Sequence, residues 1–129
     1  MKNNLSEAMP MNTAPYEHQV RAFEFACKQF GAFDGRLNSR GAALLMEMGT
    51  GKTIASIAIA GYLYQKRLIK KLLIMVPLSI LGVWEEEFSK FADFPYTITV
   101  LKGTSMQKKA ALSSIAERRV LKKFVFKKI

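Results

Sequence analysis

Cysteine is nearly absent from this sequence: Cys27 is the single one among 129 residues. A lone cysteine cannot close an internal bridge, so this is not a small secreted protein built on disulfides. Cys27 stands at helical spacing from Phe23 and Phe30, which predicts a small buried hydrophobe. This cysteine usage points to a reducing compartment.

Long apolar runs are missing as well. The longest ones, residues 53–64 and 72–84, fall short of the roughly 18–20 residues that a membrane-spanning helix needs. Residues 1–7 (MKNNLSE) lack the apolar core of a signal peptide. We therefore expect a cytoplasmic protein. Its hydrophobic content of 50% is enough for the core of one domain, and its length leaves no room for a second domain.

Acidic residues become scarce toward the C-terminus. Residues 1–100 hold 11 basic and 9 acidic residues, whereas residues 101–129 hold 9 basic residues and one acidic residue, Glu117. The second segment therefore carries +8 of the formal net charge of +10. Such a block is either a solvated helix face or a surface that attracts phosphate backbones, and charge alone identifies no partner.

The apolar pattern predicts an α/β fold. Pro15 opens a helix whose apolar residues recur at steps of three and four, and Gly31 ends it. Residues 31–41 are rich in turn formers and predict a loop. Strands are expected at residues 42–46, 72–76 and 96–101, and helices at residues 52–66, 79–92 and 105–119. This alternation predicts a parallel sheet of three to four strands with right-handed crossovers, and residues 124–126 could begin the last strand.

A glycine-rich segment lies between the first expected strand and the following helix. It reads Gly49-Thr50-Gly51-Lys52-Thr53, and this strand-loop-helix setting is the one that a phosphate-binding loop requires. Glycines let successive N–H groups point at one spot, and the helix adds the partial positive charge of its N-terminus. Lys52 would reach the β- and γ-phosphates, and the Thr53 hydroxyl would bind Mg²⁺. Met46 stands where the general motif has glycine, so a plain glycine turn is the alternative.

Three segments together carry a resemblance to a known family. They are Pro15-Tyr16-Glu17-His18-Gln19, the run from Met46 to Thr53 (MEMGTGKT), and residues 72–81 (LLIMVPLSIL) followed by residues 84–88 (WEEEF). Over residues 13–103 the chain resembles the start of the Swi/Snf-type DNA-dependent ATPases of helicase superfamily two, and particularly their bacterial and phage members. That family does not keep a glycine at the position of Met46, so this departure from the general motif fits the resemblance.

The resemblance implies an ATP and Mg²⁺ site. Gln19 would hold the adenine base through its amide, whose donor and acceptor match the base edge; the alternative for Gln19 is an exposed helix residue. His18 is expected to be a surface or capping residue. Thr53 would be the metal ligand. The complete nucleotide-binding set would be Gln19, Met48, Gly49, Thr50, Gly51, Lys52 and Thr53.

The resemblance also implies a fold and a division of the chain. The fold is that of a P-loop NTPase, a partial RecA-like lobe in three layers with a parallel sheet. Residues 13–119 would form this partial helicase ATP-binding lobe. A flexible lead-in at residues 1–12 would precede it, and a basic, truncated C-terminal tail at residues 120–129 would follow it.

A nucleic-acid contact is implied after the strand at residues 72–76. Pro77, Leu78 and Ser79 would touch DNA phosphates through backbone amides and the Ser79 hydroxyl; the alternative is a plain strand-to-helix turn. Trp84 is similar to the family's tryptophan on the next helix and is interpreted as a core residue. DNA is thus an expected partner, bound weakly by this chain alone, and no membrane partner is expected.

The acidic pair that this family carries on a later strand has no counterpart in the sequence. The pair would hold Mg²⁺ through water and position the attacking water, but Glu117 is the one acidic residue after Leu101. A second RecA-like lobe is missing too, so the chain is interpreted as a truncated first lobe that binds ATP and has no catalytic residue of its own. A separate chain could supply the remainder. The alternatives are a complete small P-loop enzyme such as a kinase, a non-catalytic nucleic-acid-binding protein, and an inactive remnant of a truncated gene.

Overall fold

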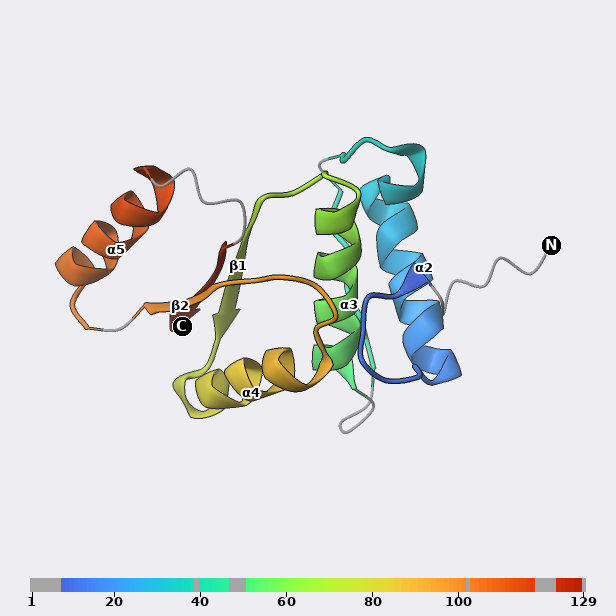
Figure 1. Ribbon diagram of the computed structural model, residues 1–129, viewed down its shortest axis with the longest axis horizontal. Coiled ribbons are helices and arrows are strands. Elements are labelled where there is room, and N and C mark those ends of the chain that lie inside the picture. The colour runs from blue at the N-terminus through green and yellow to red at the C-terminus, as the bar shows by residue number, and fades with distance from the viewer. Residues whose placement is uncertain (1–7, 39, 47–50, 102, 118–122, 129) are drawn as a thin grey trace. The chain divides into compact units, whose positions relative to one another are not determined.

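The computed structural model describes residues 8–38, 40–46, 51–101, 103–117 and 123–128, with side chains as far as residue 113. The contacts of the chain gather in two units, where the sequence led us to expect one domain. Met1–Ile69 and Glu86–Phe94 make up the helical unit. Lys70–Glu85 and Pro95–Ile129 make up the sheet unit. Figure 1 labels the elements of both units.

Helix α2 (Glu17–Phe30) forms where the apolar stripe predicts a helix. Gly31 ends it, as expected, and is followed by the short 3-10 helix η1 (Ala32–Asp34). The φ angle of Gly31 is 77°, a left-handed conformation that glycine adopts without strain. In this conformation the Gly31 N–H reaches the carbonyls of the last helical turn, which would otherwise lack partners.

Helices α2 and α3 (Lys52–Gln65) pack side by side in the helical unit (Figure 1). Helix α3 is apolar on nearly every side, which is typical of an internal helix. Phe23 of α2 meets Tyr62 of α3 edge to face, with ring centroids 5.2 Å apart. Cys27 is fully buried in the same core, which confirms the expected small hydrophobe, and this burial raises the pKa of its thiol to about 12.

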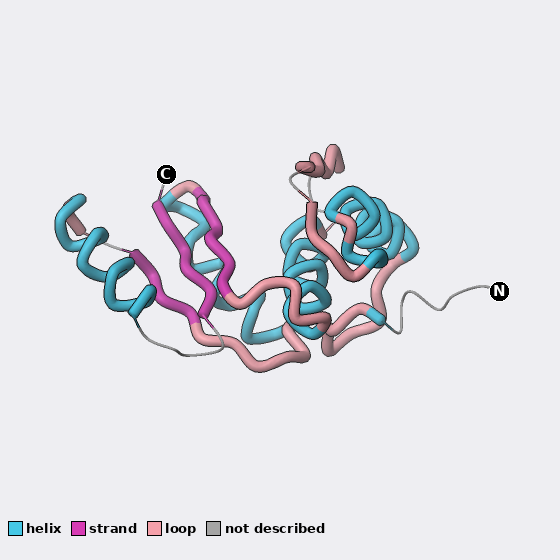
Figure 2. Tube along the Cα trace, turned by 90° about the horizontal axis from the view of Figure 1, so that it is seen from above, coloured by secondary structure: helices cyan, strands magenta, loops and turns pink. Residues whose placement is uncertain are grey.

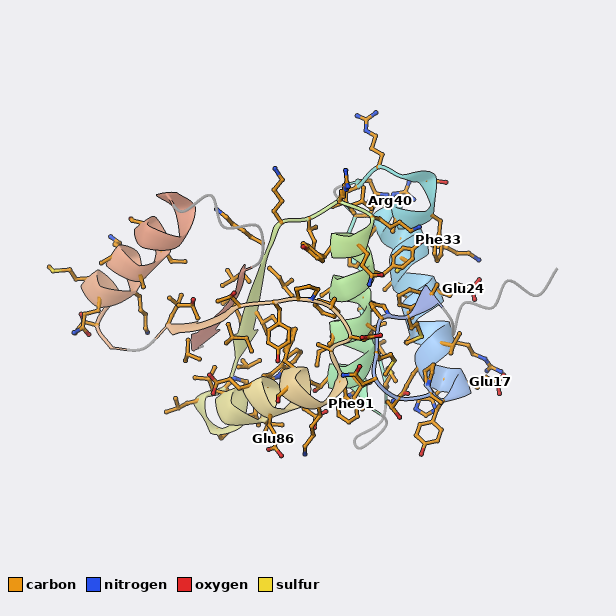
Figure 3. The ribbon with its side chains drawn as sticks, in the orientation of Figure 1. Glu17, Glu24, Phe33, Arg40, Glu86 and Phe91 are labelled. Carbon is orange, nitrogen blue, oxygen red and sulfur yellow. The ribbon has the colours of Figure 1, made fainter. Side chains whose placement is uncertain are left out.

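Acidic side chains lie on the outer side of α2. Glu17 and Glu24 point away from α3 (Figure 3), and each pairs with a basic residue one turn later, Arg21 and Lys28 respectively. Exposed pairs at this spacing add at most about 0.5 kcal/mol each to helix stability. This side of α2 is therefore a solvated surface whose ion pairs contribute little to stability.

Residues 8–12 are packed into the helical unit. Met9 and Met11 are buried, and Met11 forms an antiparallel bridge with Ala92. The Asn12 N–H donates to the carbonyl of Phe91, at the end of helix α4 (Leu81–Phe91), at 3.0 Å. These described residues differ from the expected flexible lead-in, because two unbranched methionines fill gaps in the core.

The described part of the sheet unit contains three parallel strands, β1 (Lys71–Val76), β2 (Ile98–Leu101) and β3 (Lys123–Lys128), which Figure 2 shows side by side. Their order is β1-β3-β2, so the last strand of the chain lies in the middle. Val125 of β3 is level with Leu73 on one side and with Thr99 on the other. The described part of the segment expected to be a basic tail is therefore the central strand.

Helix α5 (Ser105–Glu117) follows β2 in the sheet unit. Thr104 and Gln107 cap its start, because the Thr104 N–H donates to Gln107 Oε1 at 2.9 Å and the Gln107 N–H donates back to Thr104 Oγ1 at 3.3 Å. Ala111 of α5 packs on the buried side chain of Leu101. Across both units, no described helix is long and apolar enough to cross a membrane, and the cytoplasmic location stays a prediction.

The apolar run at residues 42–46 does not form the expected strand. Its backbone is irregular and pairs with none of the described strands. Ala42 and Leu44 pack against the core of the helical unit, while Leu45 is 97% exposed. The prediction of a strand here was wrong because an apolar run becomes a strand only where a neighbouring strand accepts its hydrogen bonds.

Candidate nucleotide site

Gly51 is the residue from which α3 begins. It is the N-cap of that helix, with φ of 84° and ψ of 38°, and its carbonyl accepts the first helical hydrogen bond from the Ala55 N–H at 3.0 Å. A non-glycine residue is strained in this left-handed conformation. Glycine offers no side chain to cap the first turn, so the N–H groups of that turn remain donors for an anion.

The two residues after Gly51 begin helix α3, where the sequence predicts a helix start. Lys52 is the first residue of α3 and is exposed, and Thr53 is half-buried. The Lys52 carbonyl accepts a hydrogen bond from Ser56 Oγ at 2.8 Å, one turn later. Among the described residues Lys52 has no acidic partner within salt-bridge distance. The remaining predicted loop residues, Met48, Gly49 and Thr50, lie outside the described residues.

Gln19 is a buried residue at the start of α2, with 4% of its surface exposed. The alternative of an exposed helix residue is therefore wrong. Its Oε1 accepts a hydrogen bond from the Tyr16 N–H at 2.9 Å, and its own N–H donates to the Tyr16 carbonyl at 3.0 Å. The carboxamide is thus held at its oxygen by the turn that opens α2.

The nitrogen end of the same carboxamide lies against Gly51. A Cβ added to Gly51 would overlap Gln19 Nε2, and it would stand 3.4 Å from Gln19 Cδ. Two predicted site residues that are 32 positions apart in the sequence are therefore neighbours in the helical unit. The structure brings the residue expected to hold the base next to the loop expected to hold the phosphates.

The main chain of Tyr16 holds Gln19 by hydrogen bonds that the sequence did not reveal. A helix start with such reciprocal hydrogen bonds is usually predicted from a serine or threonine at the N-cap. Tyr16 stands at that position instead, so the sequence did not predict the motif. His18 stacks on the Tyr16 ring at a centroid distance of 5.8 Å and is exposed, which confirms its expected surface position.

The segment expected to bind nucleic acid lies in the sheet unit. Pro77 follows β1 directly, and Leu78 and Ser79 begin the 3-10 helix η2 (Leu78–Ile80) that leads into α4. All three residues are exposed, and the Ile80 N–H donates to the Pro77 carbonyl at 3.2 Å. The segment has the geometry of a strand-to-helix turn with free outward surface. Trp84, expected in the core, is half-buried on α4.

Known proteins match this chain over the segments described above. The family pattern of the SNF2-related domain matches residues 13–126, which include Gln19, Gly51 and the turn after β1. The chain belongs to the SNF2-related domain family. It is 35% identical over 100 residues to the transcription regulatory protein SNF2 of Saccharomyces cerevisiae, and 40% identical over 93 residues to the nuclear protein STH1/NPS1 of the same organism. These matches cover 77% and 71% of this chain but 6% of each relative.

A solved structure shares the fold of this SNF2-related chain. The Sulfolobus solfataricus SWI2/SNF2 ATPase core in complex with dsDNA superposes with a TM-score of 0.71. The superposition covers 96% of this chain and 23% of that one, at 23% sequence identity. The Swi/Snf-type family resemblance is thus confirmed, together with a mixed helix and strand fold. The bacterial or phage type stays a prediction.

Metal ligands are sparse in the described part of the SNF2-related chain. No group of three or more His, Cys, Asp or Glu side chains there could hold a metal ion. Mg²⁺ needs few protein ligands when it also binds phosphate oxygens. The Thr53 hydroxyl is an oxygen donor of the kind that Mg²⁺ accepts.

Proposed function

We propose that this chain is the ATP-binding portion of a helicase-like, DNA-dependent ATPase of the SNF2 type, built as a partial RecA-like lobe in three layers. The contact between the Gln19 carboxamide and Gly51 is the observation that carries the proposal, because it joins a base-reading group to a phosphate-binding helix start. The name of the structural relative, an ATPase core, supports the same function.

The phosphates would bind at the start of α3. The N–H groups of its first turn lack a side-chain cap, and the helix dipole adds partial positive charge at this end. Lys52 would neutralise the β- and γ-phosphates, and the Thr53 hydroxyl would bind the Mg²⁺ that accompanies them. Met48, Gly49 and Thr50 would complete the loop through their backbone amides.

The base would be read by Gln19. Its carboxamide offers one donor end and one acceptor end, which matches the N7 acceptor and N6 amino donor of adenine. Gln19→Ala should therefore reduce the discrimination between ATP and GTP while leaving the phosphate contacts in place. A wild-type chain that binds both nucleotides equally well would remove this role.

Hydrolysis by this chain alone is not expected. Transfer of a phosphoryl group depends on charges positioned around the attacking water and the metal. The sequence after Leu101 offers a single acidic residue, Glu117, where a water-positioning pair would be needed. We therefore propose that residues 1–129 bind nucleotide, and that turnover needs groups that lie outside them.

DNA is the second proposed ligand. The structural relative is named as a complex with dsDNA, and the exposed turn at Pro77, Leu78 and Ser79 would offer backbone amides and a hydroxyl to phosphates. The surplus of basic residues in the sheet unit also supports DNA as a ligand. Binding by the isolated chain should be weak and independent of sequence.

Calorimetric titration with ATP and Mg²⁺ tests the nucleotide site. Lys52→Ala should weaken binding about 10- to 150-fold, since a charge-assisted contact is worth about 1.5–3 kcal/mol. Lys70→Ala, which removes an exposed lysine of the sheet unit, is the matched control and should bind as the wild type does. Equal affinities for wild type and Lys52→Ala would refute the phosphate-loop assignment.

A further inference from the structure

We propose that the main-chain N–H of Tyr16 sets the base selectivity of this site by holding the Gln19 carboxamide in one of its two orientations. The inference rests on the proposed nucleotide-binding function and adds a positioning residue to it. It begins from the hydrogen bond of 2.9 Å that Tyr16 donates to Gln19 Oε1.

A carboxamide can present its oxygen and nitrogen in either order, because rotation by half a turn exchanges the two ends. An N–H donor beside one end allows only the oxygen there. Tyr16 therefore fixes the oxygen toward the start of α2 and the nitrogen toward Gly51. With 4% of Gln19 exposed, little water is available to satisfy the reversed orientation.

The fixed order of donor and acceptor distinguishes the two purines. Adenine presents an amino donor at N6 beside an acceptor at N7, whereas guanine presents two acceptors, O6 and N7. A carboxamide with its oxygen held in place matches adenine. With guanine, the same oxygen would face the O6 acceptor, and two acceptors repel each other. The oxygen has two lone pairs, so it can accept from Tyr16 and from the N6 amino group together. A carboxamide free to turn could present its amino group to guanine instead.

The backbone of Tyr16 allows a clean removal of this N–H. Its φ of −72° and ψ of 156° lie within the range of proline, and a residue at the N-cap has no helical hydrogen bond to lose through its N–H. Tyr16→Pro removes both the N–H and the ring. Tyr16→Ala removes the same ring and keeps the N–H, so the two variants differ in the donor that the proposal invokes.

The experiment measures the dissociation constants of ATP and GTP by calorimetry for the wild type and both variants. The wild type and Tyr16→Ala should share one preference for ATP, whatever their absolute affinities. Tyr16→Pro should lose that preference by about tenfold, within the discrimination of one bidentate base contact. An unchanged preference in a folded Tyr16→Pro chain would overturn the inference and leave the nucleotide site standing.

A second variant keeps the test decisive if Tyr16→Pro does not fold. Exchange of Tyr16 for its α-hydroxy acid replaces the N–H by an ester oxygen and keeps the ring and the extended backbone of the N-cap. This ester variant should lose the preference for ATP as Tyr16→Pro does. If the folded ester variant retains that preference, the inference is overturned. If the wild type binds neither nucleotide, the proposed function fails and the inference falls with it.

Discussion

The side-chain nitrogen of Gln19 occupies the space that a Cβ on Gly51 would need. Gln19 belongs to the first turn of α2, and Gly51 is the residue from which α3 begins. The two helix starts are therefore in contact through a glutamine side chain and a glycine. Any side chain at position 51 has to displace Gln19, which makes this pair the most direct place to test the site.

Gly51→Ala should lower both stability and nucleotide affinity. Alanine is strained at a φ of 84°, at a cost of roughly 1–2 kcal/mol, and its Cβ would also push Gln19 aside. Gly35→Ala is the matched control, because Gly35 has a φ of 73° and open space around the added Cβ. We expect both variants to lose stability in urea unfolding, and Gly51→Ala alone to lose ATP affinity. Equal nucleotide binding by the two variants would contradict the role of the contact.

Gly61 should also not tolerate a larger residue, but for a different reason. It lies inside α3, and a Cβ there would overlap the ring of Phe94 and approach Pro10 Cγ within 2.6 Å. Gly61→Ala should therefore destabilise the chain by about 1–3 kcal/mol through overpacking. Gly82→Ala in α4 meets nothing within 4 Å and should gain up to about 1 kcal/mol from helix propensity. Thermal melts of both variants measure this contrast, and a stabilised Gly61→Ala chain would refute the packing.

The thiol of Cys27 should be unreactive until the chain unfolds. Burial raises its pKa from 9.0 to about 12, so the folded protein keeps its proton while the unfolded chain loses it near the ordinary value. This group therefore contributes stability that is present below about pH 9 and lost as pH rises toward about 12. Iodoacetamide should label the native protein slowly at pH 8 and rapidly in urea. Cys27→Ala should show a weaker loss of stability between pH 8 and pH 10 than the wild type, and an equal loss would contradict this reading.

Attraction to DNA should depend on the charge of the sheet unit. Deleting residues 120–129 would remove β3 along with its lysines, so substitutions on α5 are the better probe. Lys108→Gln with Lys109→Gln should reduce the salt slope of binding by up to about 1.8, at about 0.9 per neutralised phosphate. Lys28→Gln with Lys66→Gln removes the same charge from the helical unit and should change the slope less. Fluorescence anisotropy across a salt series measures both pairs. A larger effect from Ser79→Ala than from the α5 pair would instead favour the turn after β1.

Much of the local structure was predictable because it depends on neighbours in sequence. The spacing of Phe23 and Cys27 placed α2, and the left-handed tolerance of glycine placed its end at Gly31. The apolar run before Pro77 placed β1, within one residue of its observed start at Lys71. In the described part of the nucleotide loop, Gly51 and Lys52 were predicted at the start of a helix and are found there.

Contacts between distant segments were decided by the tertiary structure. No local pattern shows that β3 lies between β1 and β2, that residues 42–46 pack on helices instead of joining a strand, or that Met9 fills a core. The same holds for Gln19, whose position in α2 was predictable but whose contact with Gly51 was not. Residue periodicity determines which face of an element is apolar, whereas the partner of that face is selected by packing over the whole chain.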